Sequence, residues 1–193
     1  METTQSRLFV GVPLADEVRS RLEKGCRELR KRVEFSKWVH PKDYHITLQF
    51  LGATDNAAAE KLITILSERI GQAAPFELYV AGVGSFGSPS SPRILWAGVA
   101  GDLAALEQLQ KRVTESTRPL GFPTEDRPYR PHITIAKKYK GKAKFPQEMD
   151  LSEAGEGLFL SRPWMVREAV LFRTHMRRTP MYEEAARFPL AGR

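Results

Sequence analysis

The sequence predicts an α+β fold with antiparallel sheets, from three observations. Short apolar runs closed by turn residues occur beside helical repeats, the two kinds of element do not alternate strictly, and the chain ends in consecutive strands. The expected order is β-α-β-β-α-β-β-α-β, followed by further strands. Because a doubly wound parallel sheet requires regular alternation of strand and helix, that architecture is excluded. The length of 193 residues fits a single domain over 1–193, built from two small lobes that share a core.

The amino-terminal half is expected to contain two helices among short strands. An apolar run closed by Pro13 predicts the first strand, and apolar residues at intervals of three and four then predict a helix with Cys26 on its buried face. Gly71 ends the second helix. The predicted elements are a strand at 6–13, a helix at 15–33, strands at 38–40 and 45–51, and a helix at 56–70.

The carboxyl-terminal half is expected to be richer in strands. Asp102 is a suitable N-cap for the single helix of this half, which stops near Gly121 and Pro123. The predicted elements are strands at 76–86 and 94–100 separated by a loop, a helix after 102, a strand that starts at 132, and a closing hairpin of strands 164–173 and 182–188.

Composition restricts the class of protein. The 30 Lys and Arg against 23 Asp and Glu give a net charge of +7, which favours a polyanionic partner such as nucleic acid. A single cysteine excludes an internal disulfide and a cysteine-based zinc site. No apolar run is long enough to span a membrane, and the amino end lacks the pattern of a secretory signal. We therefore expect a soluble cytoplasmic protein.

One short motif occurs twice, as HITL at 45–48 and as HITI at 132–135, each after a polar turn. Since side chains alternate across a strand, the His and Thr of each copy share one face. The repeat is interpreted as two β-α-β units whose His-Thr faces meet in one cleft. On this interpretation Ile46, Leu48, Phe50, Ile133 and Ile135 face the core, and Gln49 and Ala136 lie on the same faces as the histidines.

Two imidazoles and two hydroxyls around one cleft suit chemistry at a phosphodiester. One neutral and one protonated histidine can coexist near neutral pH, and they can act as base and acid on opposite sides of phosphorus. The threonine hydroxyls can donate hydrogen bonds to the non-bridging oxygens, where negative charge accumulates. Arg130, two residues before His132, is a candidate for clamping the phosphate.

These motifs resemble the two-histidine (2H) phosphoesterase superfamily, and within it the RNA 2′,3′-cyclic phosphodiesterases historically called 2′-5′ RNA ligases. The resemblance runs through RLFVGVPL, WVHPKDYHITLQFLG, SPRILWAGV and RPHITIAK, in that order. It implies two pseudo-symmetric lobes with helices packed outside, no cofactor, and hydrolysis of RNA 2′,3′-cyclic phosphate ends to 2′-phosphates, with weak reverse 2′-5′ joining. It also implies that His45 is the proton donor to the 3′ oxygen, that His132 is the base that activates water, and that Thr47 and Thr134 hold the phosphate.

The sequence is also compatible with other functions. The same machinery can act on a small cyclic nucleotide or an ADP-ribose cyclic phosphate, and an RNA-end-binding module without turnover is a rival from another class. A metal site is disfavoured because zinc normally needs three or four protein ligands and no supporting motif accompanies the histidines. No obligate protein partner is evident, so a monomer is expected.

Three further features have structural or functional interpretations. The lysine-rich segment 137–144 is either a solvated loop or a site that recruits an RNA backbone. Tyr139 and Phe9 are candidates for stacking on the terminal base. His40 is expected to cap a strand end or lie near the cleft mouth, and His175 to lie on the surface, both without a catalytic role.

Overall fold

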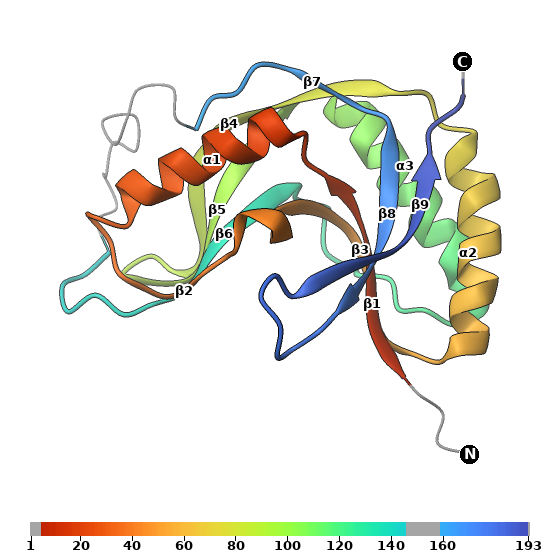
Figure 1. The fold of residues 1–193 in the computed structure, drawn as a ribbon, viewed down its shortest axis with the longest axis horizontal. Coiled ribbons are helices and arrows are strands. Elements are labelled where there is room, and N and C mark those ends of the chain that lie inside the picture. The colour runs from red at the N-terminus through yellow and green to blue at the C-terminus, as the bar shows by residue number, and fades with distance from the viewer. Residues whose placement is uncertain (1–4, 146–158, 193) are drawn as a thin grey trace.

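The structure, a computed structural model, describes residues 5–145 and 159–192 and confirms the α+β prediction (Figure 1). The strands are β1 (Ser6–Pro13), β2 (Phe35–Trp38), β3 (His45–Thr54), β4 (Phe76–Ser88), β5 (Ser91–Gly101), β6 (His132–Tyr139), β7 (Trp164–Val166), β8 (Glu168–Thr174) and β9 (Tyr182–Pro189). The helices are α1 (Asp16–Leu29), α2 (Asn56–Gly71) and α3 (Leu103–Thr117), with short 3-10 turns η1 (Pro41–Asp43) and η2 (Arg118–Leu120).

The strands form two antiparallel sheets. The four-stranded sheet has the order β3-β1-β8-β9, and the five-stranded sheet has the order β2-β6-β5-β4-β7. Helices α2 and α3 pack together beside the four-stranded sheet, while α1 lies across the five-stranded one (Figure 1). A shared core of aliphatic and aromatic side chains fills the space between the helices and both sheets. No helix of the described residues is long and apolar enough to cross a membrane.

Local sequence explains where α2 and α3 begin. Asp55 accepts a hydrogen bond from the backbone N–H of Ala58 at 2.8 Å, and Asp102 accepts one from Ala105 at 2.9 Å. Each carboxylate thereby satisfies a donor that the first turn of a helix leaves free. The apolar stripe of α2 is then buried in the core as its spacing predicts.

The two copies of the His-x-Thr motif occupy equivalent places. β1 and β3 form an antiparallel pair connected through α1, β2 and η1, and β5 and β6 form an antiparallel pair connected through α3 and η2. In each case the histidine is the first residue of the second strand. The repeat of β-α-β units predicted from the motif is therefore present in the fold.

Some predicted boundaries were wrong. The strand expected at 38–40 lies at Phe35–Trp38, before the turn that Pro41 begins. The strand expected at 164–173 is two strands in different sheets, because β7 pairs with β4 whereas β8 pairs with β1. The loop expected between 86 and 94 is a tight turn, since β4 and β5 continue to Ser88 and from Ser91.

Irregular pairing also corrects the predicted faces of the motif strands. The β1–β3 register shifts twice, so Phe50 is 59% exposed and Gln49 is buried, the reverse of the expectation. The β5–β6 register shifts once after Thr134, which buries Ala136 in the core. Each shift inserts a residue into one strand, which breaks the two-residue period on which the prediction depended.

Candidate active site

The motif strands β3 and β6 belong to different sheets but contact each other. Each strand begins with its histidine, and both histidines and both threonines are half-buried. The charge of His132 is among the causes that lower the pKa of His45, as expected for two imidazoles that lie close together. The structure therefore brings the two motifs into one site, as the repeat predicted.

The imidazole of His45 packs against three aromatic rings. The His45 ring centroid is 4.6 Å from that of Phe9, 5.2 Å from that of Tyr182 and 5.7 Å from that of Phe172. A Cβ at Gly11 of the adjacent strand β1 would lie 2.9 Å from the Ile46 carbonyl and 3.4 Å from the His45 ring. Glycine at this position therefore allows β3 and its histidine to approach β1 closely.

The second imidazole is flanked by aromatic rings from its own five-stranded sheet. The His132 ring meets Phe86 edge-on at 4.9 Å between centroids, and the Trp96 ring lies 6.4 Å away. Phe86 and Trp96 also contact each other at 5.3 Å. The two histidines thus have similar surroundings built from unrelated residues.

Both imidazoles are oriented by a hydrogen bond to the backbone carbonyl of the residue two positions earlier in the chain. Nδ1 of His45 lies 2.8 Å from the carbonyl oxygen of Asp43, and Nδ1 of His132 lies 2.7 Å from that of Arg130. A carbonyl can only accept, so in each ring Nδ1 carries the proton and Nε2 is left with its lone pair. Nε2 of His45 lies 3.1 Å from Oγ1 of Thr47, which donates to it in the neutral state.

Burial lowers the pKa of both histidines. It lowers the pKa of His45 to about 4, where the positive charge of Lys137 acts in the same direction and the bond to the Asp43 carbonyl opposes it. Burial also lowers the pKa of His132, opposed by the bond to the Arg130 carbonyl. Without ligand, burial therefore favours the neutral form of both imidazoles, whereas the sequence suggested one neutral and one protonated ring.

A buried carboxylate links the first motif to the closing hairpin. Asp43 is 5% exposed, and its carboxylate accepts hydrogen bonds from the backbone N–H groups of Met181 and Tyr182, each at 3.0 Å. The carbonyl of the same residue orients His45. Sequence reasoning missed Asp43, because its neighbours in the fold are far away in the chain.

The second motif is linked to the first through the segment that precedes it. The hydroxyl of Tyr129 donates to the carbonyl oxygen of Thr47 at 2.9 Å. The next residue, Arg130, has an exposed side chain, and its carbonyl orients His132. The predicted phosphate clamp by the guanidinium of Arg130 stays a prediction.

The prediction that Phe9 can stack on a base was wrong, whereas that for Tyr139 stays a prediction. Phe9 is 2% exposed beneath His45, so no base can stack on it. The ring of Tyr139 packs against Phe35 and Phe145, and its hydroxyl donates to the carbonyl of Ala143. An exposed ring on this face belongs to Phe50, which lies opposite Phe9 in the β1–β3 pair with 5.9 Å between centroids.

The remaining histidines and the cysteine have structural environments. His40 caps η1 by accepting a hydrogen bond from the N–H of Lys42, and His175 pairs with Glu183 near the hairpin turn. Cys26 is buried and accepts a hydrogen bond from Tyr44 at 3.3 Å, and burial raises its pKa to about 11. Among residues 5–145 and 159–192, no group of three or more His, Cys, Asp or Glu could hold a metal ion.

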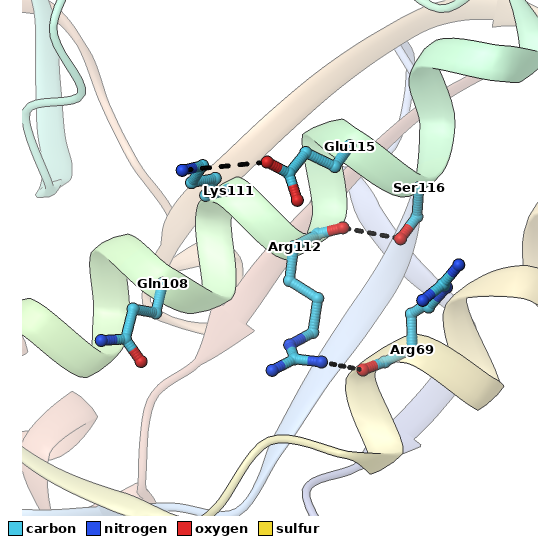
Figure 2. Close-up of a pocket in the computed structure, with 6 residues that line it drawn as sticks. All are labelled: Arg69, Gln108, Lys111, Arg112, Glu115 and Ser116. Carbon is cyan, nitrogen blue, oxygen red and sulfur yellow. Dashed lines mark hydrogen bonds and ion pairs between the residues drawn. The ribbon is translucent and has the colours of Figure 1, made fainter.

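A basic pocket of about 370 Å³ lies between α2 and α3, away from the histidines (Figure 2). In it, Arg112 reaches the carbonyl oxygen of Arg69 near the end of α2, and Lys111 pairs with Glu115 within α3. Cations near the last carbonyls of a helix stabilise that helix. The pocket therefore has a structural explanation in the contact between the two helices.

Known proteins share sequence similarity with this chain along most of its length. A sequence model of the 2′-5′ RNA ligase superfamily matches residues 14–177. An RNA 2′,3′-cyclic phosphodiesterase of Geobacillus stearothermophilus is 40% identical over 188 residues, which are 97% of this chain and 58% of the relative. One of Bacillus subtilis (strain 168) is 32% identical over 191 residues, which are 99% of this chain and 100% of the relative. The chain thus spans little more than half of the Geobacillus protein.

Solved structures show the same fold. A protein of Thermus thermophilus has a TM-score of 0.78 and 26% identity, covering 96% of this chain and 98% of its own. LigT of E. coli, solved with 3′-AMP, has a TM-score of 0.75 and 21% identity, covering 97% of this chain and 99% of its own. Each likeness extends over nearly the whole chain, so the fold as a whole is shared.

Proposed function

The chain belongs to the 2′-5′ RNA ligase superfamily, and from that premise we propose that it is an RNA 2′,3′-cyclic phosphodiesterase. It opens a terminal 2′,3′-cyclic phosphate to a 2′-phosphate and a free 3′ hydroxyl. The observation that carries the proposal is the matched pair of imidazoles, each with Nδ1 bound to a backbone carbonyl and the lone pair on Nε2. The relatives named above support the substrate class.

The reaction needs two proton transfers on opposite sides of phosphorus. Nε2 of neutral His132 takes a proton from water while the water oxygen forms a bond to phosphorus. The bond from phosphorus to the 3′ oxygen breaks, and that oxygen receives the proton from Nε2 of protonated His45. Each transfer contributes about 10²–10⁴-fold to the rate. The assignment of donor and acceptor follows the family, since both imidazoles have equivalent anchoring.

Charge and hydrogen bonding supply the other part of catalysis. The hydroxyls of Thr47 and Thr134 donate to the non-bridging oxygens, whose charge grows as water attacks. When phosphate binds, its negative charge raises the pKa of both imidazoles, which makes a protonated His45 available. Arg130 adds a guanidinium that can bind a phosphate through two parallel hydrogen bonds. The exposed ring of Phe50 offers a surface for the nucleoside.

The lowered pKa values predict an acidic activity optimum. In the free enzyme the donor must be charged although burial favours its neutral form, so kcat/KM is expected to peak below pH 6.5. On the alkaline side it should fall about tenfold per pH unit, because one proton is lost. The optimum of kcat should lie at higher pH, since bound phosphate stabilises the imidazolium. Initial rates on a nucleoside 2′,3′-cyclic phosphate measure both profiles, and profiles flat between about pH 5 and pH 9 would contradict the assignment.

The proposal is tested by incubating the protein with an oligoribonucleotide that ends in a 2′,3′-cyclic phosphate. The expected product carries a 2′-phosphate, and the rate is expected to be the same in excess chelator, since every step uses protein groups. Tight binding of the RNA end without turnover would instead favour the non-catalytic module. Loss of turnover in chelator would favour a metal-dependent mechanism instead.

A further inference from the structure

Two lysines form a directly opposed pair on the neighbouring strands β2 and β6. Lys37 and Lys137 are Cα partners in this antiparallel ladder, so their side chains leave the same face of the sheet. Like charges directly opposite each other destabilise a sheet. Among the residues that the structure describes, neither lysine forms an ion pair with a carboxylate. The pair therefore concentrates positive charge that a bound anion would neutralise.

The irregular register of β6 turns this pair toward the histidines. The shift after Thr134 places Ala136 in the core and the next residue, Lys137, on the other face. Lys137 is half-buried, and its charge lowers the pKa of His45. Burial and the charge of Lys37 in turn lower the pKa of Lys137. Lys137 lies on β6, which contacts the strand β3 that carries His45, and Lys37 is its partner on β2.

Lys37 extends toward the closing hairpin rather than into solvent alone. Its Nζ lies 3.8 Å from Sδ of Met181, and the backbone N–H of Met181 donates to the Asp43 carboxylate beneath the first motif. A thioether is a weak acceptor, so the ammonium keeps most of its hydrogen-bonding capacity for a ligand. Lys37 therefore lies at the margin of the candidate active site with a charge available for a ligand.

We propose that Lys37 and Lys137 form a second anion subsite, which binds a phosphate of the substrate other than the cyclic one. We assign that phosphate to the phosphodiester that joins the terminal nucleotide to the RNA strand. This inference rests on the proposed function, because it takes the cyclic phosphate to lie between the histidines. It makes the enzyme selective for RNA ends over mononucleotides, which carry no second phosphate.

The test compares three substrates: a nucleoside 2′,3′-cyclic phosphate, a dinucleotide with the same end, and that dinucleotide with an uncharged methylphosphonate linkage. The wild-type protein is expected to have a higher kcat/KM on the charged dinucleotide than on the other two. In Lys37→Met the ratio of dinucleotide to mononucleotide should fall about tenfold, which is the effect of losing one charged hydrogen bond. The slope of log kcat/KM for the dinucleotide against the logarithm of the salt concentration should also become shallower by about one unit, because one cation no longer contacts the RNA.

Control variants distinguish the effect of a positive charge at position 37 from the effect of the protein's overall positive charge. Lys37→Arg should keep the ratio, and Lys24→Met, which removes an exposed lysine of α1, should leave the ratio and the activity at their wild-type values. An unchanged ratio in Lys37→Met would overturn the inference. An ADP-ribose cyclic phosphate, whose pyrophosphate is the other source of a second phosphate, is assayed as a fourth substrate, and a loss confined to it would also overturn the inference. Failure of the wild-type protein to hydrolyse any substrate would overturn the proposed function itself.

Discussion

Replacing either motif histidine with alanine is expected to reduce turnover to background. Without His132 no group takes the proton from water, and without His45 no group protonates the departing 3′ oxygen. Each loss is expected to reduce kcat by at least about 10²–10⁴-fold, since that is the typical effect of one positioned acid or base. Initial rates of cyclic phosphate hydrolysis measure the loss, and thermal unfolding of both variants shows whether the fold survives.

His175→Gln is the matched control for these variants. It removes an imidazole that pairs with Glu183 at the hairpin, outside the motifs, and its activity should equal that of the wild-type protein. The double variant His45→Ala/His132→Ala should be little worse than either single variant, because acid and base act as a unit. Near-wild-type hydrolysis by either single variant would contradict the assigned chemistry.

Removing a motif hydroxyl is expected to have the second largest effect. Thr47→Val and Thr134→Val keep the shape of the side chain but lose a donor to the phosphate oxygens, which should lower kcat by about 10²-fold. Thr47→Ser and Thr134→Ser restore a hydroxyl and should recover most of the activity. Steady-state kinetics on one nucleoside 2′,3′-cyclic phosphate compare all four variants.

The two valine variants should differ in their pH profiles. In the neutral state the Thr47 hydroxyl donates to Nε2 of His45, which favours the uncharged ring. Thr47→Val should therefore raise the pKa of His45 and move the limb of kcat/KM that this residue controls to higher pH. An unchanged pH profile in Thr47→Val would contradict this contact. For the prediction on kcat, values for both valine variants equal to that of the wild-type protein would show that the hydroxyls do not bind the phosphate oxygens.

The sequence predicts the parts of the site that depend on local patterns. The period of two puts His45 and Thr47 on one face of a strand, and the repeat at His132 and Thr134 indicates that the second unit has the same geometry. Burial of Cys26 follows in the same way from the helical period. The face on which each of these side chains lies is determined by the local period of its strand or helix, so the sequence alone predicts it.

The sequence does not predict the parts that depend on inserted residues or on distant contacts. The residue types along a strand do not show where an extra residue interrupts its pairing. Neither the exposure of Phe50 nor the direction of Lys137 could therefore be predicted. The contact of Asp43 with the backbone of Met181 and Tyr182 joins segments far apart in the chain. The low pKa of His45 follows from burial among aromatic rings that three separate strands supply.

The most direct test is a crystal structure with a nucleoside 2′-phosphate, the product of the proposed reaction. We expect the phosphorus atom between the two imidazoles, with phosphate oxygens within hydrogen-bond distance of Nε2 of His45 and Nε2 of His132. A phosphate bound only elsewhere, for example in the basic pocket between α2 and α3, or imidazoles that face away from it, would contradict the account.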